Sequence, residues 1–177
     1  MTIADDGKAY RYLIETERLR LREFVLDDKY FVVELLNSPG WLQFIGDRHV
    51  HTPDDAISYL ANGPHKSYAT NGYGLWLVEH KEDMQSIGMC GILKRPSLTC
   101  PDIGFAFLTE FGGNGYAIES VLATLAYGRE NLNIPVMAGI VLPDNARSIR
   151  LLEKAGLHLV GPFGFADGPQ ELLLYRN

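Results

Sequence analysis

The chain has 177 residues, 46% hydrophobic and 21% charged, which fits one globular domain over residues 1–177 and excludes a disordered chain, a collagen-like repeat or a coiled coil. A net charge of −6 argues against broad binding to nucleic acid or an anionic membrane, and two cysteines are too few for a disulfide framework. The start lacks the basic and apolar regions of a signal peptide, and no apolar stretch approaches the ~20 residues of a membrane helix. We therefore expect a soluble, cytoplasmic protein.

The first half of the chain predicts a strand and two helices before a hairpin. After a polar lead-in, residues 1–12, leucine and arginine alternate over 18–22, which indicates a half-buried strand with its arginines on the solvated face. Thr52 as an N-cap, followed by Pro53, marks a later helix start. In chain order we expect a strand at 18–22, a helix at 29–37 stopped by 37–40, a helix from 53 that breaks near 62–64, and strands at 74–80 and 86–93.

The second half alternates strands and helices. Apolar residues hold helical spacing after Ala117, and Gly156 stands where a left-handed helix cap is favoured. The expected elements are a strand at 102–108, a helix at 117–131, a strand at 136–142, a helix at 145–155, and strands near 157–160 and 170–176. This order predicts a mixed α/β fold with one sheet covered by helices.

A glycine-rich loop lies between the strand at 102–108 and the helix that follows it. Gly112, Gly113 and Gly115 let the backbone turn sharply and approach a ligand closely, and the helix points its free N–H groups at the loop. These features favour a phosphate or pyrophosphate, although the spacing is neither the dinucleotide fingerprint nor a P-loop. No Lys or Arg occurs between Arg95 and Arg129, so we expect backbone groups to supply most of the contacts to such a ligand. A turn without a ligand is the alternative.

A second polar motif, Asn145-Ala-Arg-Ser148, lies where the strand at 136–142 runs into a helix. Asn145 or Asp144 can act as the N-cap with Ser148 bonding near it, which explains one or two of these residues. Their place beside the glycine loop, where two neighbouring strands would open a cleft, suits an extended ligand.

Taken in order, these segments resemble the GNAT superfamily of acetyl-CoA-dependent N-acetyltransferases, and most closely its RimJ/RimL-type branch of ribosomal-protein N-terminal acetyltransferases. The resemblance covers most of the chain and implies the acyl-CoA N-acyltransferase fold, an α+β arrangement with a single mixed, mostly antiparallel twisted sheet flanked by helices. It rests on the segments 14–22, 87–92, 102–105, 113–119, 145–148 and 152–157.

The resemblance implies that acetyl-CoA is the co-substrate and lies in a V-shaped opening between the strands at 102–108 and 136–142. The pantetheine amides would pair with the backbone near Phe107, Leu108 and Thr109, as an added strand would. The remaining cofactor contacts would come from Gly112, Gly113, Asn114, Gly115, Tyr116 and Ala117 at the pyrophosphate, and from Asn145 and Ser148 on the pantetheine side.

Acyl transfer to an amine needs an uncharged nitrogen, a polarised thioester carbonyl and a protonated leaving thiolate. Asp102 is the candidate base, acting directly or through a water, where the branch often has Glu; a solvated acid at a strand start is the alternative. Ser148 can donate to the thiolate, and a backbone N–H near Leu108 can polarise the carbonyl. Two positions depart from the family: Gly112 replaces a Gln, Arg or Trp, and Leu151-Leu152 stands where many members have a tyrosine acid.

Other polar residues have simpler interpretations. His49 and His51 share a face if their segment is extended, but no third metal ligand is evident, so we expect surface histidines and no metal. Glu119 suits the positive end of a helix, Cys90 lies in a buried strand and is expected to be inert, and Trp41 is expected in the core or beside an acceptor.

We therefore expect an N-acetyltransferase that moves an acetyl group from acetyl-CoA directly to a primary amine, either a protein or peptide N-terminus or a small amine, in a ternary complex. A non-catalytic CoA-binding regulatory domain of the same fold is the alternative. Neither nucleic acid nor a membrane is expected as a partner, and a homodimer is compatible with the sequence. The acceptor would be recognised mostly by residues 25–75, where no decisive motif occurs.

Overall fold

A computed structural model describes residues 2–3, 9–165 and 171–177 of the chain. Its main strands are β3 (Tyr12–Glu15), β4 (Leu19–Arg22), β5 (Leu75–His80), β6 (Ser86–Leu93), β7 (Asp102–Phe107), β8 (Ala138–Val141), β9 (His158–Phe163) and β10 (Leu172–Arg176). The α-helices are α1 (Lys29–Leu36), α2 (Pro39–Phe44), α3 (Pro53–Leu60), α4 (Lys66–Asn71), α5 (Tyr116–Asn131) and α6 (Ala146–Lys154). Short helical turns are η1 (Leu26–Asp28), η2 (Ala61–His65) and η3 (Thr109–Phe111).

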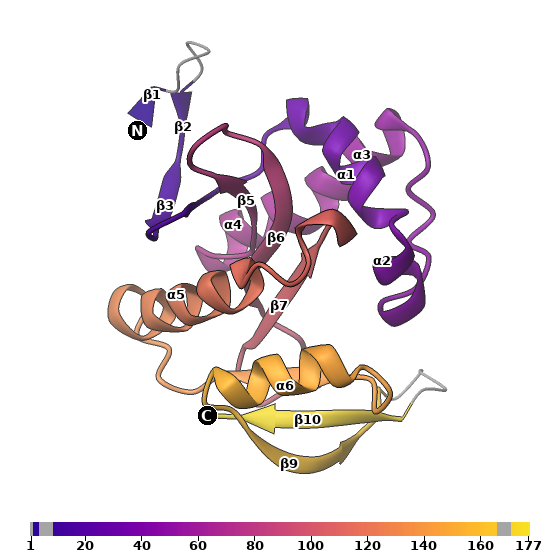
Figure 1. Cartoon of the computed structure of the whole chain (residues 1–177), viewed down its shortest axis with the longest axis vertical. Coiled ribbons are helices and arrows are strands. Elements are labelled where there is room, and N and C mark those ends of the chain that lie inside the picture. The colour runs from indigo at the N-terminus through magenta and orange to yellow at the C-terminus, as the bar shows by residue number, and fades with distance from the viewer. Residues whose placement is uncertain (1, 4–8, 166–170) are drawn as a thin grey trace.

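The strands form one eight-stranded sheet in the order β3-β4-β5-β6-β7-β8-β10-β9. Within the described ranges, β7 and β8 run parallel and the other neighbouring strands are antiparallel. Helices α1, α2 and α3 gather on one side of the sheet and α5 on the other, with α6 beside β8 and β10 (Figure 1). The expected mixed, mostly antiparallel sheet flanked by helices is confirmed.

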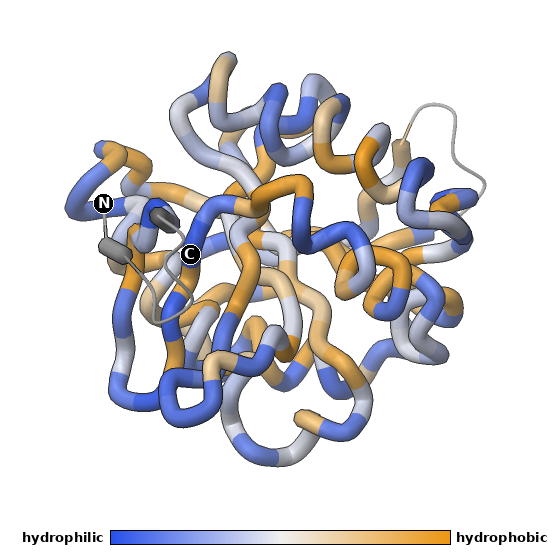
Figure 2. Tube along the Cα trace, turned by 90° about the horizontal axis from the view of Figure 1, so that it is seen from above, coloured by the Kyte–Doolittle hydropathy of each residue, from blue (hydrophilic) through white to orange (hydrophobic). Residues whose placement is uncertain are grey.

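The core lies on both faces of the sheet, because alternate residues of a strand point to opposite faces. Trp76 and Val78 of β5 pack on the side of α5, whereas Leu77 between them packs on the side of α1 and α3. Hydrophobic segments accordingly run through the interior, and much of the outer chain is hydrophilic (Figure 2). None of the helices described is both long and apolar enough to cross a membrane.

Three segments contain elements that the sequence did not predict. Within the lead-in expected over 1–12, the short strands β1 (Thr2–Ile3) and β2 (Ala9–Tyr10) pair with each other and Tyr12 begins β3, while residues 1 and 4–8 lie outside the described residues. The segment 37–40 ends α1 but also begins α2, with Pro39 in its first turn. The break expected near 62–64 is the π-helical turn η2, which joins α3 to α4 and accommodates Pro64, a residue without an N–H to donate.

The solvated-face expectation for the arginines of β4 is wrong for Arg22, which is 3% exposed. Its Nη1 and Nη2 donate to the two oxygens of Asp28 at 2.8 Å, and its Nε donates to Glu79 Oε1 at 2.6 Å. The Tyr12 hydroxyl donates to the other Glu79 oxygen at 3.0 Å, and burial, followed by the charge of Glu79, raises the pKa of Tyr12 to about 12. This buried network ties β3, β4, β5 and η1 together.

Candidate active site

The parallel strands β7 and β8 are joined at one register position, Asp102 with Ala138. β7 stays paired with β6 along all six of its residues, and β8 is paired with β10 along its other edge. Beyond Asp102 the two strands therefore diverge, and their facing edges carry backbone groups that do not pair across the gap. This divergence, called the V below, is the opening that the family resemblance implied.

The hydrogen bonds to β6 decide which backbone groups of β7 face the V. Leu108 donates its N–H to Ile87 O at 3.0 Å, and in an antiparallel pair alternate residues turn their backbone groups to the same neighbour. Phe105 and Phe107 therefore direct their N–H and C=O groups away from β6 and toward β8. The N–H of Leu108 itself is occupied, so among the N–H groups near Leu108, where a carbonyl-polarising group is expected, that of Phe107 is the nearest one that faces the V.

The glycine loop closes the wide end of the V. Thr109 begins η3, and its carbonyl accepts from Gly112 N–H at 3.0 Å. Gly113 and Gly115 have φ angles of 85° and 81°, in the left-handed region that favours glycine, and Gly115 is the N-cap of α5. Because the first N–H groups of a helix have no intrahelical acceptor, those of Tyr116 and Ala117 can bind an anion at the exposed loop.

Arg147 of α6 lies against the start of this loop. A Cβ on Gly112 would stand 2.8 Å from Arg147 Nη2, so the guanidinium occupies space that a side chain at position 112 would need. Arg147 forms no ion pair with any carboxylate in the part of the chain that the structure describes. Its charge therefore stays available at the loop, whereas the sequence predicted that backbone groups would supply most of the contacts there.

Arg18, just before β4, lies at the other end of the loop. Its Nη1 donates to Asn114 O at 2.9 Å, and its Nε donates to Glu119 Oε2 at 2.7 Å. Glu119 Oε1 also accepts from Thr16 Oγ1 at 2.6 Å and from Arg18 N–H at 3.0 Å. Partial burial alone would raise the pKa of Glu119, but these hydrogen bonds and the charge of Arg18 hold it below its usual value. Glu119 therefore anchors Arg18 against the loop.

The Tyr116 side chain contacts residues outside the glycine loop, His80 and Arg18. Its hydroxyl lies 3.3 Å from His80 Nε2, while His80 Nδ1 lies 3.1 Å from Asp83 Oδ1. The Arg18 guanidinium stacks 4.6 Å from the centre of the Tyr116 ring. The Tyr116 side chain thus positions the first turn of α5.

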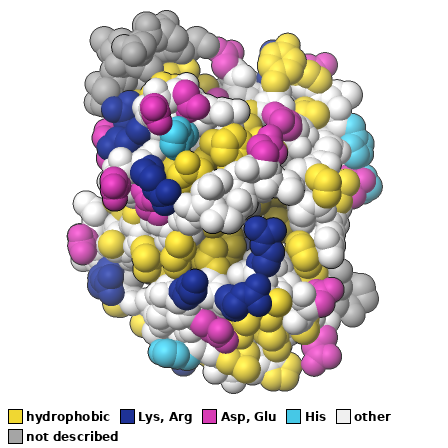
Figure 3. All heavy atoms as spheres, viewed as in Figure 1, with side chains coloured by type: hydrophobic (Ala, Val, Ile, Leu, Met, Phe, Trp, Pro, Cys, Tyr) yellow, Lys and Arg dark blue, Asp and Glu magenta, His cyan; other side chains and the backbone are white. Residues whose placement is uncertain are grey.

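The second polar motif lies at the start of α6. Asn145 is the N-cap, and its side chain accepts from Ser148 N–H at 3.1 Å, so the capping interpretation is confirmed. The half-buried Ser148 hydroxyl has no hydrogen-bond partner among the residues described. Because β7 and β8 are parallel, α5 and α6 begin at the same end of the sheet, and basic side chains gather across this part of the surface (Figure 3).

The sequence profile of the GNAT acetyltransferase domain matches residues 18–158. The chain belongs to the GNAT acetyltransferase family. It is 40% identical to the uncharacterised protein YkkB of Bacillus subtilis over 91 residues, which are 49% of this chain and 53% of YkkB. The match to the N-acetyltransferase YnaD of the same species is 28% over 150 residues and covers 85% of each chain. The chain thus spans about half the length of YkkB and most of YnaD.

Solved structures of GNAT acetyltransferases share the fold. An acetyltransferase from Agrobacterium tumefaciens has a TM-score of 0.78 at 25% identity, covering 96% of this chain and 95% of that one. RimL, a ribosomal L7/L12 α-N-protein acetyltransferase in complex with coenzyme A, has a TM-score of 0.81 at 15% identity, covering 94% and 97%. Ribosomal-protein acetyltransferases are therefore among the structural neighbours of this GNAT chain.

Asp102 lies at the narrow end of the GNAT chain's V, five residues from Phe107, or about 17 Å along an extended strand. It is 2% exposed, and Arg95 Nε donates to both of its carboxylate oxygens at 3.0 Å. Burial raises the pKa of Asp102 more than Arg95 lowers it. The structure thus brings together the loop, Arg18, Arg147 and Ser148, and places Asp102 at a distance from them.

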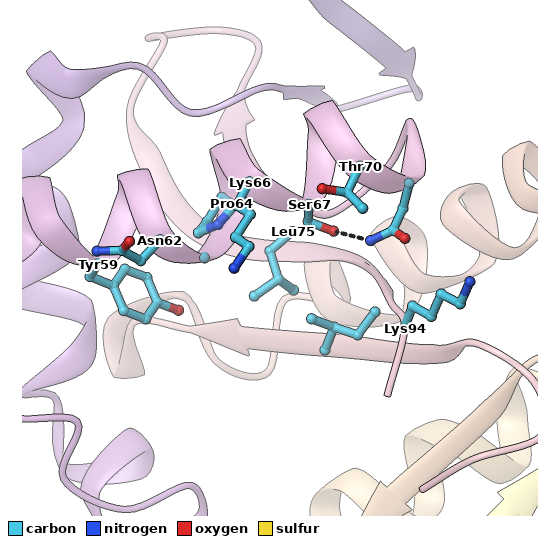
Figure 4. A pocket seen from close by; sticks show the side chains of 11 residues that line it. Tyr59, Asn62, Pro64, Lys66, Ser67, Thr70, Leu75 and Lys94 are labelled. Atoms are coloured by element: carbon cyan, nitrogen blue, oxygen red, sulfur yellow. Dashed lines mark hydrogen bonds between the residues drawn. The ribbon is translucent and has the colours of Figure 1, made fainter. Parts of the chain in front are cut away.

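A cavity of about 320 Å³ lies between η2, α4 and the ends of β5 and β6 (Figure 4). Leu75 and Leu93 line it, and both approach the point where a Cβ of Gly104 would stand, at 3.2 and 2.8 Å. Gly104 and Asp102 point to the same face of β7, so the cavity and the buried carboxylate share that face. The lining includes Lys66 and Lys94 but no acidic side chain.

Proposed function

We propose that the chain transfers the acetyl group of acetyl-CoA directly to a primary amine, either a peptide or protein N-terminus or a small amine, in a ternary complex. The observation that carries this proposal is the V between β7 and β8, which has at its wide end the N-terminus of α5 and Arg147, a cation without a carboxylate partner among the described residues. An extended, anionic, amide-containing ligand fits such a site.

The residues present fit acetyl-CoA. Its diphosphate would bind the N–H groups of Tyr116 and Ala117, with Arg147 and Arg18 balancing the charge. Its pantetheine amides would pair with the edge of β7 at Phe105 and Phe107. Coenzyme A in the RimL structure supports this choice, because RimL shares the fold.

The chain's own groups match the three requirements of the reaction. The amine nitrogen attacks the thioester carbonyl, the C–S bond breaks, and the amine's proton must leave while the thiolate gains one. We assign the polarising N–H to Phe107 and the thiolate donor to Ser148, whose hydroxyl is unengaged. We assign the base to Asp102 acting through a chain of several water molecules, because its burial and its distance exclude direct contact with an amine at Phe107 and exceed the reach of a single water.

Direct transfer is favoured over an acetyl-cysteine intermediate. Cys90 is fully buried, and burial raises the pKa of its thiol to about 11, which disfavours the nucleophilic thiolate. Cys100 precedes β7 and so lies at the narrow end of the V, beside Pro101.

The acceptor is assigned to the cavity beside α4, since that cavity shares a face of β7 with Asp102. Two lysines and no carboxylate line it, which favours an acceptor that carries an anionic group near its amine.

A non-catalytic CoA-binding domain is the second candidate. It is favoured by the ion pair between Asp102 and Arg95, which occupies both oxygens of the proposed base, and by leucines at 151 and 152 where many family members carry a tyrosine.

Two measurements test these proposals in sequence. In a thermal-shift titration, acetyl-CoA and CoA at a hundredfold excess over Kd should raise the Tm by about 5–11 °C, while NAD and ATP should not. Release of free thiol from acetyl-CoA is then followed with a panel of amines and peptides. Thiol release above background supports the enzyme, CoA binding without release supports the second candidate, and no thermal shift contradicts both.

A further inference from the structure

The loop between α2 and α3 brings three exposed side chains together, Asp47, His49 and His51. Their nearest ligand atoms all lie within 4.8 Å of one another. Asp47 Oδ2 is 3.4 Å from His49 Nδ1 and 3.5 Å from His51 Nε2. From sequence we expected two histidines without a third ligand; the structure supplies that ligand as Asp47.

The two spacings to Asp47 Oδ2, 3.4 and 3.5 Å, are those of atoms that share one metal ion. Nitrogen and oxygen ligands bind Zn²⁺ at roughly 2.0–2.2 Å, so two of them at a tetrahedral angle stand about 3.4 Å apart. An ion at the common centre would reach all three side chains with small movements, because each side chain is exposed.

The hydrogen bonds of Asn37 fix which nitrogen of His51 can accept a proton or bind a metal. Asn37 Nδ2 donates to Val33 O and to Val50 O, both at 2.7 Å, so its Oδ1 must be the atom 2.8 Å from His51 Nδ1. His51 Nδ1 therefore carries the hydrogen, and in the neutral ring Nε2 has a lone pair directed at Asp47 Oδ2. Two such acceptors 3.5 Å apart repel unless a proton or a metal ion lies between them. Histidines that bind a metal through one ring nitrogen usually donate a hydrogen bond from the other, which orients the ring. The hydrogen bond from His51 Nδ1 to Asn37 Oδ1 has this arrangement.

His49 is held in an uncommon conformation that aims it at the same carboxylate. Its φ angle is 55°, in the left-handed region that residues with side chains rarely adopt. Asp47 Oδ1 accepts the His49 backbone N–H at 2.7 Å and so stabilises the turn, while Oδ2 faces both imidazoles. Asp47 Oδ1 thus stabilises the turn, and Asp47 Oδ2 faces the two imidazole rings.

We propose that Asp47, His49 and His51 bind one divalent transition-metal ion of the Zn²⁺ type, with water completing its coordination. Two imidazoles and one carboxylate select zinc, cobalt or nickel over magnesium or calcium, which prefer all-oxygen sites. Through Asn37, the ion would hold the 45–52 loop to the C-terminal end of α1. The site lies on the α1–α3 segment, and it stands or fails independently of the acetyl-transfer proposal.

Isothermal titration of the 177-residue chain with ZnCl₂, near neutral pH in a non-chelating buffer, tests the site. We expect one equivalent of Zn²⁺ to bind, and Asp47→Asn and His51→Ala each to weaken that binding at least tenfold. His158→Ala, which removes an exposed histidine outside the cluster, is the matched control and should bind as the unaltered chain does.

Co²⁺ supplies a second readout, since its visible spectrum reports coordination by the protein. Absorption typical of nitrogen-coordinated Co²⁺ should appear with the unaltered chain and be lost in Asp47→Asn. No binding of either ion, or binding that both cluster variants retain, would overturn the proposal; the latter result would place the ion elsewhere, for example at Cys100 or His158. Because the three ligands are exposed, circular dichroism should show the variants to be folded.

Discussion

Arg147 Nη2 lies 2.8 Å from the point where a Cβ of residue 112 would stand, so the guanidinium of this α6 residue occupies space that is free only because residue 112 is a glycine. The branch that this chain resembles carries a bulky or polar side chain at that position. Here the covering group comes instead from the helix on the other side of the V. A cofactor diphosphate on the loop would thus contact both α5 and α6.

Replacing Arg147 by alanine should weaken CoA binding by about tenfold to a hundredfold, since a hydrogen bond to a charged group contributes roughly 1.5–3 kcal/mol. Isothermal titration at two salt concentrations measures this change, and the salt dependence should also fall. Arg150→Ala, an exposed arginine of the same helix, is the control. Equal losses for both variants would indicate a diffuse charge effect and not a contact at Gly112.

Gly112→Ala should reproduce part of the Arg147→Ala loss, because the new methyl group must displace the guanidinium or the Thr109 carbonyl 3.0 Å away. When both changes are combined, the losses should not add, since the second removes a contact that the first has already disturbed. Fully additive losses would show that the two residues act separately.

Glu119→Gln should loosen Arg18 and weaken CoA binding at neutral pH. The pKa of Glu119 is below its usual value in the folded chain, so ionised Glu119 stabilises the fold above the unfolded pKa of about 4.3, and this contribution is lost as pH falls through the folded pKa. Urea unfolding should therefore separate the variant from the unaltered chain at pH 7 and much less near pH 3. Glu110→Gln, which removes one negative charge from an exposed acid of η3, is the control for net charge.

Arg22→Met should lower the free energy of unfolding by about 3–5 kcal/mol, because it leaves Asp28 and Glu79 buried without their cation. Arg20→Met on the same strand removes a partly exposed side chain with a 3.6 Å ion pair and should change stability by about 0–1 kcal/mol. Chemical denaturation of the two variants gives both numbers. Similar values for the two would mean that burial of Arg22 does not decide its contribution.

The sequence predicted elements whose signals are local. Thr52 and Pro53 marked the start of α3, Gly156 the end of α6, and the glycine loop the junction of β7 and α5. These signals depend on a few neighbouring residues, so a single sequence carries them.

Most of the errors concern partners far apart in the chain; one, at Asp47, concerns the backbone conformation of neighbouring residues. The strict alternation over 18–22 predicted a solvated face for Arg22. Nothing in that segment indicates that Glu79 of β5 lies close enough to pair with Arg22. Arg18 and Arg147 were missed because the search for cations stayed near the loop, although Arg147 stood within a motif already singled out. Asp47 was missed because only a left-handed turn at His49 brings it between the two imidazoles.

The role of Asp102 can be tested by the pH dependence of kcat/KM. If Asp102 is the base, activity should fall on the acid side at a pH above the ordinary aspartate pKa of about 3.9, because burial raises its pKa. Asp102→Asn should lower kcat by roughly 10²–10⁴ and abolish that acid limb. Arg95→Met should move the limb to higher pH, since Arg95 lowers the pKa of Asp102. An unchanged profile in both variants would leave Asp102 a structural partner of Arg95.

The charge of the cavity beside α4 predicts acceptor preference. Lys66 and Lys94 line it without an acidic neighbour in the lining, so Lys94→Gln should lower kcat/KM for an acidic peptide about twofold to fivefold, the range expected for one partly solvated ion pair. The same change should leave a neutral peptide unaffected, and adding Lys66→Gln should enlarge the difference. Lys154→Gln on α6 controls for net charge, because it removes one positive charge outside the cavity. If all three variants lower activity equally with both peptides, long-range steering explains the effect and the acceptor binds elsewhere.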